Sequence, residues 1–213
     1  YIAVIALASL WVDAYDFAAF TFGVAAFKAT FPILQKAPLL LGLAVSAVQM
    51  GAVIGAVAGG WLTDRLGRRT MFILNMILFT VMAIGAGLAP DPYTFTVFRI
   101  LLGFALGADT ATGFTYIFEY LERTQRLFWS NLWQLQWYLM YLVTIAIVVL
   151  PLYFYFHTLL TPWLWRVTMI LGGVFAFIIL MLRARIPESV LWLAYKGHLA
   201  TAKRILKQTY GID

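Results

Sequence analysis

Six long stretches of this sequence carry almost no charge, and they constrain the fold more than any other feature. A helix needs about 20 apolar residues to cross the hydrocarbon core of a bilayer. The composition agrees with such spans, because 63% of the residues are hydrophobic and only 11% are charged. The sequence therefore predicts an all-α membrane protein that crosses the plasma or cell membrane six times. The predicted spans are 1–26, 39–62, 71–89, 95–118, 129–155 and 167–183.

The positive charges divide unequally between the two ends of these predicted spans. Eleven of the 15 Lys and Arg residues fall on one side, and membrane proteins collect such residues on the cytoplasmic face. They are Arg65, Arg68, Arg69, Arg123, Arg126, Arg183, Arg185, Lys196, Lys203, Arg204 and Lys207. The other four are Lys28, Lys36, Arg99 and Arg166. The pattern predicts that both termini are cytoplasmic, and it attributes the net charge of +6 to topology and anionic lipid, with no nucleic acid partner.

No feature of the sequence indicates an enzyme, a cofactor or a metal site. Cysteine is absent, and His157 and His198 stand alone in predicted loops. Neither a phosphate-binding glycine loop nor a hydrolase motif is present. The chain divides into a six-helix transmembrane half-bundle over 1–186 and a polar, basic segment over 187–213. We expect the second segment to form short amphipathic cytoplasmic helices around Gly197, or to begin a linker.

The connection between spans two and three, "GGWLTDRLGRRT" at 59–70, is the most specific local motif. A cytoplasmic loop collects arginines for topology alone, but that explanation leaves the glycines and the aspartate aside. The motif is similar to the G-x-x-x-D-x-x-G-R-R signature of the major facilitator superfamily. The resemblance implies a conformational gate, in which the aspartate caps a neighbouring helix end and the arginines pair with acids, holding the outward-facing state closed. The matching residues are Gly60, Asp64, Gly67, Arg68 and Arg69.

Span four and its inner end, residues 99–126, resemble the phosphate:proton symporters of that superfamily and their metabolite relatives. "DAYD" in the first span is typical of the same symporters, and "PESVLWL" after span six resembles the end of the first half in sugar porters. Glu119 and Arg126 are thereby added to the predicted gate. The matching positions around span four are Arg99, Gly103, Gly107, Asp109, Glu119, Tyr120 and Arg126.

This resemblance implies the N-terminal half of a transporter with twelve spans, in which the solute binds between two six-helix halves near the midplane. The expected function is proton-coupled symport of a small anion or metabolite, such as phosphate or an organic acid, by alternating access. The expected partners are a second six-helix half on the same gene or a separate chain, the lipid bilayer, the solute and protons. The alternative is a structural subunit that does not transport and packs within a larger membrane complex.

Three acids lie inside the predicted spans, namely Asp13, Asp16 and Asp109. Charged groups are costly in a bilayer, so function is the default explanation, although each acid can instead pair with a base and serve packing alone. Asp13 and Asp16 are three residues apart and share one face of a helix. Burial and mutual repulsion favour a protonated carboxyl at neutral pH, so we predict a proton relay of the three acids. Arg99, near the outer end of its span, is expected to anchor the helix by reaching the surface.

The resemblance also marks candidate solute ligands. The phosphate symporters usually follow the aspartate of span four with Tyr-Pro, and that tyrosine helps to hold phosphate. This chain has Thr110 and Ala111 there, which leaves the solute open between phosphate and another small metabolite. The family's glutamine ligand in span five has two candidates here, Gln134 and Gln136, of which Gln136 is preferred. We expect Thr110 and one of these glutamines to contact the solute.

Glycines recur every four residues in two of the predicted spans. Span two has Gly51, Gly55 and Gly59, and span four has Gly103 and Gly107. Small residues at this spacing let helix backbones approach closely within a membrane. In the resembled fold span two abuts the opposite half. We therefore expect the ridge of span two to pack against a partner, and to face lipid without one.

Overall fold

The structure is a computed structural model that describes residues 8–120, 123–157, 161–184 and 186–210. Every regular element in these ranges is a helix, as the apolar spans predicted. The elements are α2 (Ser9–Thr30), α3 (Ile33–Lys36), α4 (Pro38–Leu66), α5 (Arg68–Gly87), α6 (Pro92–Tyr120), α7 (Arg123–Thr144), the π-helix η1 (Ile145–Val149), α8 (Leu150–Phe156), α9 (Pro162–Arg183), α10 (Val190–Tyr195) and α11 (Leu199–Tyr210).

Six helical segments are long and apolar enough to cross a membrane, in agreement with the sequence prediction. The first predicted span included 1–7, which lie outside the described residues. The sixth helix begins at Pro162, earlier than the predicted 167, and so contains Arg166. That charge is accommodated because the guanidinium donates a hydrogen bond to the carbonyl of Gly87 at 3.1 Å. The segments are Leu10–Thr30, Pro38–Leu66, Arg68–Gly87, Pro92–Glu119, Gln134–Tyr155 and Pro162–Arg183.

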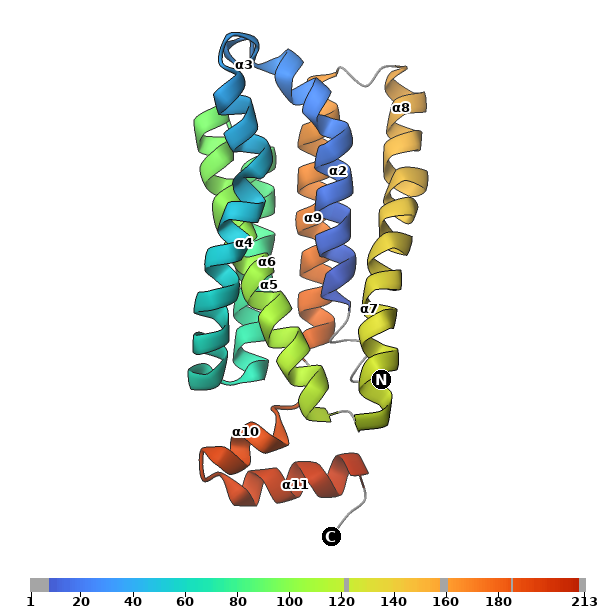
Figure 1. The fold of residues 1–213 in the computed structure, drawn as a ribbon. Coiled ribbons are helices and arrows are strands. Elements are labelled where there is room, and N and C mark those ends of the chain that lie inside the picture. Colours follow the sequence, from blue (N-terminus) through green and yellow to red (C-terminus); the bar gives the residue numbers. More distant parts are fainter. Residues whose placement is uncertain (1–7, 121–122, 158–160, 185, 211–213) are drawn as a thin grey trace.

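Successive spans run in opposite directions, so their connections alternate between the two ends of the bundle (Figure 1). α4 packs along α6, and α5 packs against both α6 and α9. α2 packs against α9 and α7, and α7 has its main interhelical contact with α2. The C-terminal ends of α4, α6 and α9 therefore share the lower end of the bundle in Figure 1. This is the end to which the sequence analysis assigned most of the positive charge.

The turn between α5 and α6 shows how the sequence sets a helix end. Asp91 precedes Pro92, and its carboxylate accepts hydrogen bonds from the N–H groups of Tyr93 and Thr94, each at 2.9 Å. The Thr94 hydroxyl also donates to Asp91 at 2.6 Å, and this bond is the main cause that lowers the pKa of the Asp91 carboxyl. An aspartate cap followed by proline in the first turn is a preferred helix start.

The fifth span changes helix type partway along its length. Residues Ile145–Val149 form a π-helical turn between α7 and α8. Pro151 follows almost directly; proline lacks an N–H group, and its ring crowds the carbonyl four residues earlier. A wider turn at this point removes the conflict without ending the helix. The predicted continuous span 129–155 is therefore helical throughout, but with a local irregularity.

The glycine ridge of span two packs against α6 of the same chain, so the prediction that it meets a partner is wrong. A Cβ added at Gly55 would overlap the backbone of Phe104, and one at Gly51 would overlap the carbonyl of Ile100. Gly103 fits in the same way against the backbone of α4. The prediction failed because the two glycine repeats face each other, which the spacing within each helix cannot reveal.

We predict that Gly55→Ala lowers the thermal stability of the purified protein. Overpacking typically costs about 1–3 kcal/mol, and the backbone atoms that the new methyl group meets cannot rotate away. The midpoint of thermal unfolding in detergent measures the effect. Gly42→Ala is the matched control, because it lies on the same helix and its Cβ would meet nothing within 4 Å. Equal midpoints for the two variants would contradict the close α4–α6 packing.

Two short helices follow the last span, on either side of Gly197. Gly197 has a φ of 83°, a backbone conformation that glycine adopts without strain. Ser189 begins α10, and its hydroxyl accepts a hydrogen bond from the N–H group of Trp192 at 3.3 Å. Leu193 of α10 and Ala202 of α11 are buried. This pair of helices lies across the lower end of the bundle (Figure 1).

Candidate functional site

Asp16 of α2 and Arg99 of α6 form a buried ion pair. One guanidinium nitrogen of Arg99 lies 2.6 Å from each carboxylate oxygen of Asp16, and Arg99 is only 1% exposed. The guanidinium carbon also lies over the ring of Phe20, 4.5 Å from its centroid. The expectation that Arg99 reaches the surface is therefore wrong, because an acid and an aromatic ring stabilise its charge inside the bundle.

A second buried ion pair joins α6 to the end of α9. Arg183 donates to Asp109 at 2.5 Å, and both side chains are fully buried. The guanidinium carbon of Arg183 lies 4.2 Å from the ring centroid of Phe72 on α5. Arg183 lies at the end of an apolar span in the sequence, and was therefore predicted as one of the arginines of a connection and not as a site residue. No sequence signal distinguishes it, because an arginine that ends an apolar helix is typical of a cytoplasmic flank.

Asp13 is the third acid, and it forms no ion pair with another described residue. It is 3% exposed, and its Oδ1 atom is buried without a hydrogen-bond partner in the described structure. Asp13 lines a cavity of about 390 Å³ between α2, α6 and α7, which we call the α2–α6–α7 cavity. The predicted solute ligands Thr110 and Gln134 line it as well. The full lining is Leu10, Asp13, Phe17, Leu106, Thr110, Gln134, Trp137 and Tyr138.

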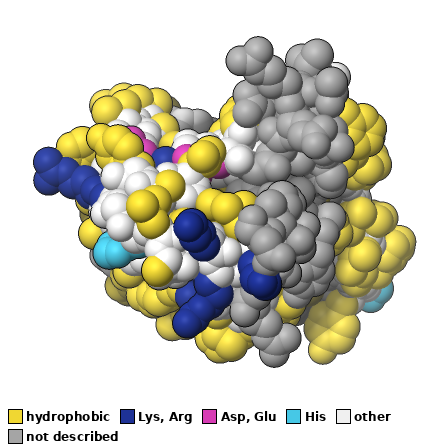
Figure 2. All heavy atoms as spheres, turned by 90° about the horizontal axis from the view of Figure 1, so that it is seen from below, with side chains coloured by type: hydrophobic (Ala, Val, Ile, Leu, Met, Phe, Trp, Pro, Cys, Tyr) yellow, Lys and Arg dark blue, Asp and Glu magenta, His cyan; other side chains and the backbone are white. Residues whose placement is uncertain are grey.

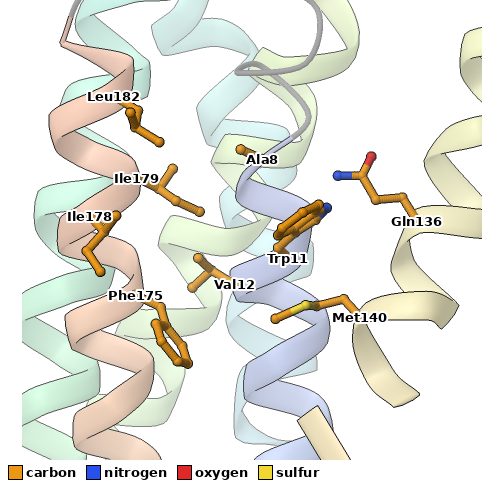
Figure 3. A pocket seen from close by; sticks show the side chains of 9 residues that line it. All are labelled: Ala8, Trp11, Val12, Gln136, Met140, Phe175, Ile178, Ile179 and Leu182. Carbon is orange, nitrogen blue, oxygen red and sulfur yellow. The ribbon is translucent and has the colours of Figure 1, made fainter. Parts of the chain in front are cut away.

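Gln136, the preferred solute ligand, lines a different cavity. This cavity of about 470 Å³ lies between α2, α7 and α9, and its other lining is almost entirely apolar. In Figure 3 the Gln136 amide lies near Trp11 of α2, with apolar side chains of α9 across the cavity. Residues two apart on a helix point to different faces. The structure thus groups Gln134, rather than Gln136, with the other predicted ligand and the unpaired acid.

Arg68 is the centre of a polar cluster at the lower end of the bundle. Its guanidinium lies 2.7 Å from Glu119 of α6 and 3.0 Å from Asp64. It also donates to the carbonyl of Thr63 at 3.2 Å. Arg68 is buried, whereas the side chain of Asp64 is 73% exposed. The structure therefore brings together the arginine and the acids that the sequence assigned to a gate.

The acid that caps the start of α5 is Glu188, and not Asp64. Its carboxylate accepts hydrogen bonds from the N–H groups of Arg68 at 2.8 Å and Arg69 at 3.2 Å. A carboxylate is stabilised at a helix N-terminus by unpaired N–H groups and by the helix dipole. Gly67 permits the close approach, since its φ is 96° and a Cβ there would lie 3.1 Å from the carboxyl carbon of Glu188. The sequence analysis missed this role, although Glu188 lies in "PESVLWL".

Two further residues of the same segment complete the cluster. The Ser189 hydroxyl donates to Glu119, and the Trp192 indole donates to the carbonyl of Asp64 at 2.9 Å. Glu119 thus receives hydrogen bonds from Arg68 on one oxygen and from Ser189 on the other. The segment after α9 is thereby tied to α4, α5 and α6.

The remaining predicted gate residues contribute less to this cluster. Gly60 has open space where a Cβ would lie. Arg69 is exposed, and its guanidinium donates to the carbonyl of Ala184 at 3.1 Å. The side chain of Arg126 lies outside the described residues. No group of three His, Cys, Asp or Glu side chains within the described ranges could hold a metal ion.

The lower end of the molecule also exposes basic side chains. Figure 2 views this end and shows Lys and Arg side chains across the described part of its surface. The exposed residues are Arg65, Arg69, Lys196, Lys203, Arg204 and Lys207. The positive charge that the sequence assigned to one side of the spans therefore lies on one end of the structure.

The six apolar spans, their buried ion pairs and the polar cluster at one end define an integral, multi-pass membrane protein built as a helical half-bundle. Comparison with known families identifies it further. The chain belongs to the major facilitator superfamily, because the family described as "Sugar (and other) transporter" matches residues 2–212. The named relatives in this family are transporters.

The relatives include transporters that are named for inositol, for D-xylose or for metabolites in general. Inositol transporter 4 of Arabidopsis thaliana is 32% identical over 194 residues, which cover 87% of this chain and 31% of that protein. The D-xylose transporter of Levilactobacillus brevis is 34% identical over 165 residues, covering 78% of this chain and 35% of that protein. This chain thus spans about a third of the length of these curated relatives.

Solved structures agree on the fold. The inward open conformation of the xylose transporter XylE from E. coli is similar with a TM-score of 0.84 and 24% identity. The match covers 99% of this chain and 53% of that one. The described bundle therefore has the fold of one half of a major facilitator protein, as the motifs implied.

We predict that Arg68→Ala opens the lower end of the complete protein. The variant loses the hydrogen bond from Arg68 to Glu119, and a hydrogen bond to a charged group contributes about 1.5–3 kcal/mol. The ratio of closed to open protein should therefore fall at least about tenfold. The rate at which a membrane-impermeant thiol reagent labels Thr115→Cys on α6 reports the change. Arg65→Ala is the control, because Arg65 lies three residues before Arg68, in the last turn of α4, and its guanidinium stacks on Trp61. Equal labelling rates in the two variants would leave this cluster without a gating role.

Proposed function

We propose that the chain is one six-helix half of a proton-coupled secondary transporter that carries a small metabolite by alternating access. The protein lies in a cell membrane with its basic lower end on the cytoplasmic side. The solute binds in the α2–α6–α7 cavity, and a second six-helix half, on the same or a separate chain, covers it. The observation that carries the proposal is the buried, unpaired carboxyl of Asp13, which lines the same cavity as Thr110 and Gln134.

The balance of charges inside the bundle supports proton coupling. The Asp16–Arg99 and Asp109–Arg183 pairs each combine one negative and one positive charge. An unpaired carboxylate in the membrane interior is costly, whereas a protonated carboxyl is neutral and can donate a hydrogen bond. Asp13 therefore binds a proton when its cavity is closed to water and releases it when the cavity opens to the cytoplasm.

The lining of the cavity supports a small hydroxylated solute, such as a sugar or polyol, over the phosphate or organic acid expected from the motifs. The hydroxyl of Tyr138 and the amide of Gln134 can both donate to and accept from solute hydroxyls. The Thr110 hydroxyl donates to the carbonyl of Leu106 and can accept a hydrogen bond from the solute. Trp137 adds an apolar ring face. No Lys or Arg is among the residues that line this cavity in the described structure, and an ionised Asp13 would repel an anion. The relatives named for inositol and D-xylose are in keeping with this solute class.

We predict that Asp13→Asn in the complete transporter abolishes accumulation driven by a pH gradient but preserves solute exchange at equal pH. The amide keeps hydrogen-bonding groups in the cavity but cannot carry a proton, so accumulation should fall at least about tenfold, the equivalent of 1.4 kcal/mol. Uptake and counterflow of radiolabelled D-xylose and myo-inositol in vesicles measure the two activities.

The control for this experiment is Asp91→Asn, which removes an acid outside the spans and should leave accumulation intact. Wild-type accumulation by Asp13→Asn would exclude Asp13 as the proton carrier. A wild-type protein that moves no sugar, polyol, phosphate or organic acid would instead favour the alternative of a structural subunit.

The two glutamines of span five provide a second test. Gln134→Ala should raise the KM for solute by about tenfold, because a lost hydrogen bond to a buried polar group costs about 1–3 kcal/mol. Gln136→Ala should leave the KM unchanged, since Gln136 lines the other cavity. Initial rates of counterflow over a range of solute concentrations give both values. The reverse order of effects would place the solute in the α2–α7–α9 cavity.

A further inference from the structure

Asp13, Asp109 and Arg183 lie close to one another although they belong to three helices. Asp13 lines the α2–α6–α7 cavity together with Thr110, which directly follows Asp109 on α6. Asp109 is paired with Arg183 at the end of α9. Two acids and one arginine therefore form one buried layer of charge next to the α2–α6–α7 cavity.

The other groups that face Asp13 do not change this charge count. The charges that act on its carboxyl are those of Asp109 on α6, Arg183 on α9 and Asp16 on α2 itself. Asp16 is already neutralised by an arginine of α6. On α7, the titratable group that lines the cavity is the neutral phenol of Tyr138. The layer consequently needs one proton for neutrality, and it has two carboxyls that could hold it.

The two carboxyls are not equivalent. Asp109 accepts a hydrogen bond from Arg183 on Oδ1, whereas its Oδ2 is buried without a partner. Asp13 has no ion pair, and its Oδ1 is buried without a partner. A neighbouring guanidinium stabilises the ionised form of the carboxyl it contacts. The contact with Arg183 therefore favours the ionised form at Asp109 over the ionised form at Asp13.

We propose that Arg183 is a positioning residue that determines which carboxyl carries the coupling proton: it holds Asp109 ionised and leaves the proton to Asp13. This inference rests on the proposed proton-coupled function. Arg183 is not among the described residues that line the α2–α6–α7 cavity, and it acts through the two acids. In the release step the O–H bond of Asp13 breaks, the proton passes to water on the cytoplasmic side, and the nearby positive charge of Arg183 stabilises the carboxylate that remains.

The proposal is tested by pH-dependent infrared difference spectroscopy of the complete protein in lipid, which detects the C=O stretch of buried protonated carboxyls and needs no solute. The wild-type protein should show one such titration, and Asp13→Asn should remove it. Arg183→Gln should move the midpoint to higher pH by about one to three units, because the two acids lose the compensating positive charge of Arg183. The same variant should gain a contribution from Asp109 that Asp109→Asn removes.

Matched variants separate charge from structure. Arg183→Lys keeps the positive charge and should keep the wild-type midpoint. The double variant Arg183→Gln with Asp109→Asn removes both charges of the pair and should return the midpoint close to the wild-type value. Arg166→Gln is the control on the same helix. Arg166 donates to a backbone carbonyl rather than to an acid, so this variant should not shift the midpoint.

Asp109→Asn alone provides an independent sign test, and it applies even if Arg183→Gln does not fold. It leaves Arg183 without its acid, so Asp13 should release its proton more readily, and the midpoint should move to lower pH by about one to three units. An unchanged midpoint in either Arg183→Gln or Asp109→Asn overturns the proposal. The proposal is also overturned if Asp13→Asn still shows the infrared titration of the wild-type protein. A protein that titrates as expected but accumulates no solute would contradict the proposed function and leave the role of Arg183 standing.

Discussion

A charge in the interior of a bilayer is stable only when another charge or a proton neutralises it, and the centre of this bundle is organised by that requirement. Arg99 neutralises Asp16 and Arg183 neutralises Asp109, which ties α6 to both α2 and α9. Asp13 remains, and it lies beside the cavity proposed to hold the solute. The interactions that fix three helices against one another thereby also single out one carboxyl for chemistry.

The sequence predicted the six spans, the three membrane acids and a group of gate residues that includes Arg68 and Glu119, because apolar length, isolated charge and a specific motif are all local properties. It did not predict which arginine serves which acid. Arg183 and Arg99 were both read as residues near a membrane surface, and only the approach of distant helices shows that they are buried. The sequence could not choose between Gln134 and Gln136 for a related reason, since the cavity that each one lines depends on the rotation of α7 about its axis.

The helices of the bundle are unequally covered by one another. α4 and α6 approach so closely that glycine is required at their contact, with Gly55 lying against the backbone of Phe104. In span five, by contrast, only 17% of the apolar stretch is buried within the chain, against 56% in span four. The contact between α4 and α6 is thus closed by backbone against backbone, whereas most of span five is left for lipid or a partner to cover.

The cap of α5 by Glu188 joins positions that lie 120 residues apart in the chain. During synthesis the N–H groups of Arg68 and Arg69 therefore leave the ribosome long before their acceptor exists. Water can serve them in the meantime, because they lie at a helix end rather than in the hydrocarbon core. The lower end of the bundle closes only after the segment that follows the last span has been made, so its closure is a late step of assembly that requires all six spans to be in place.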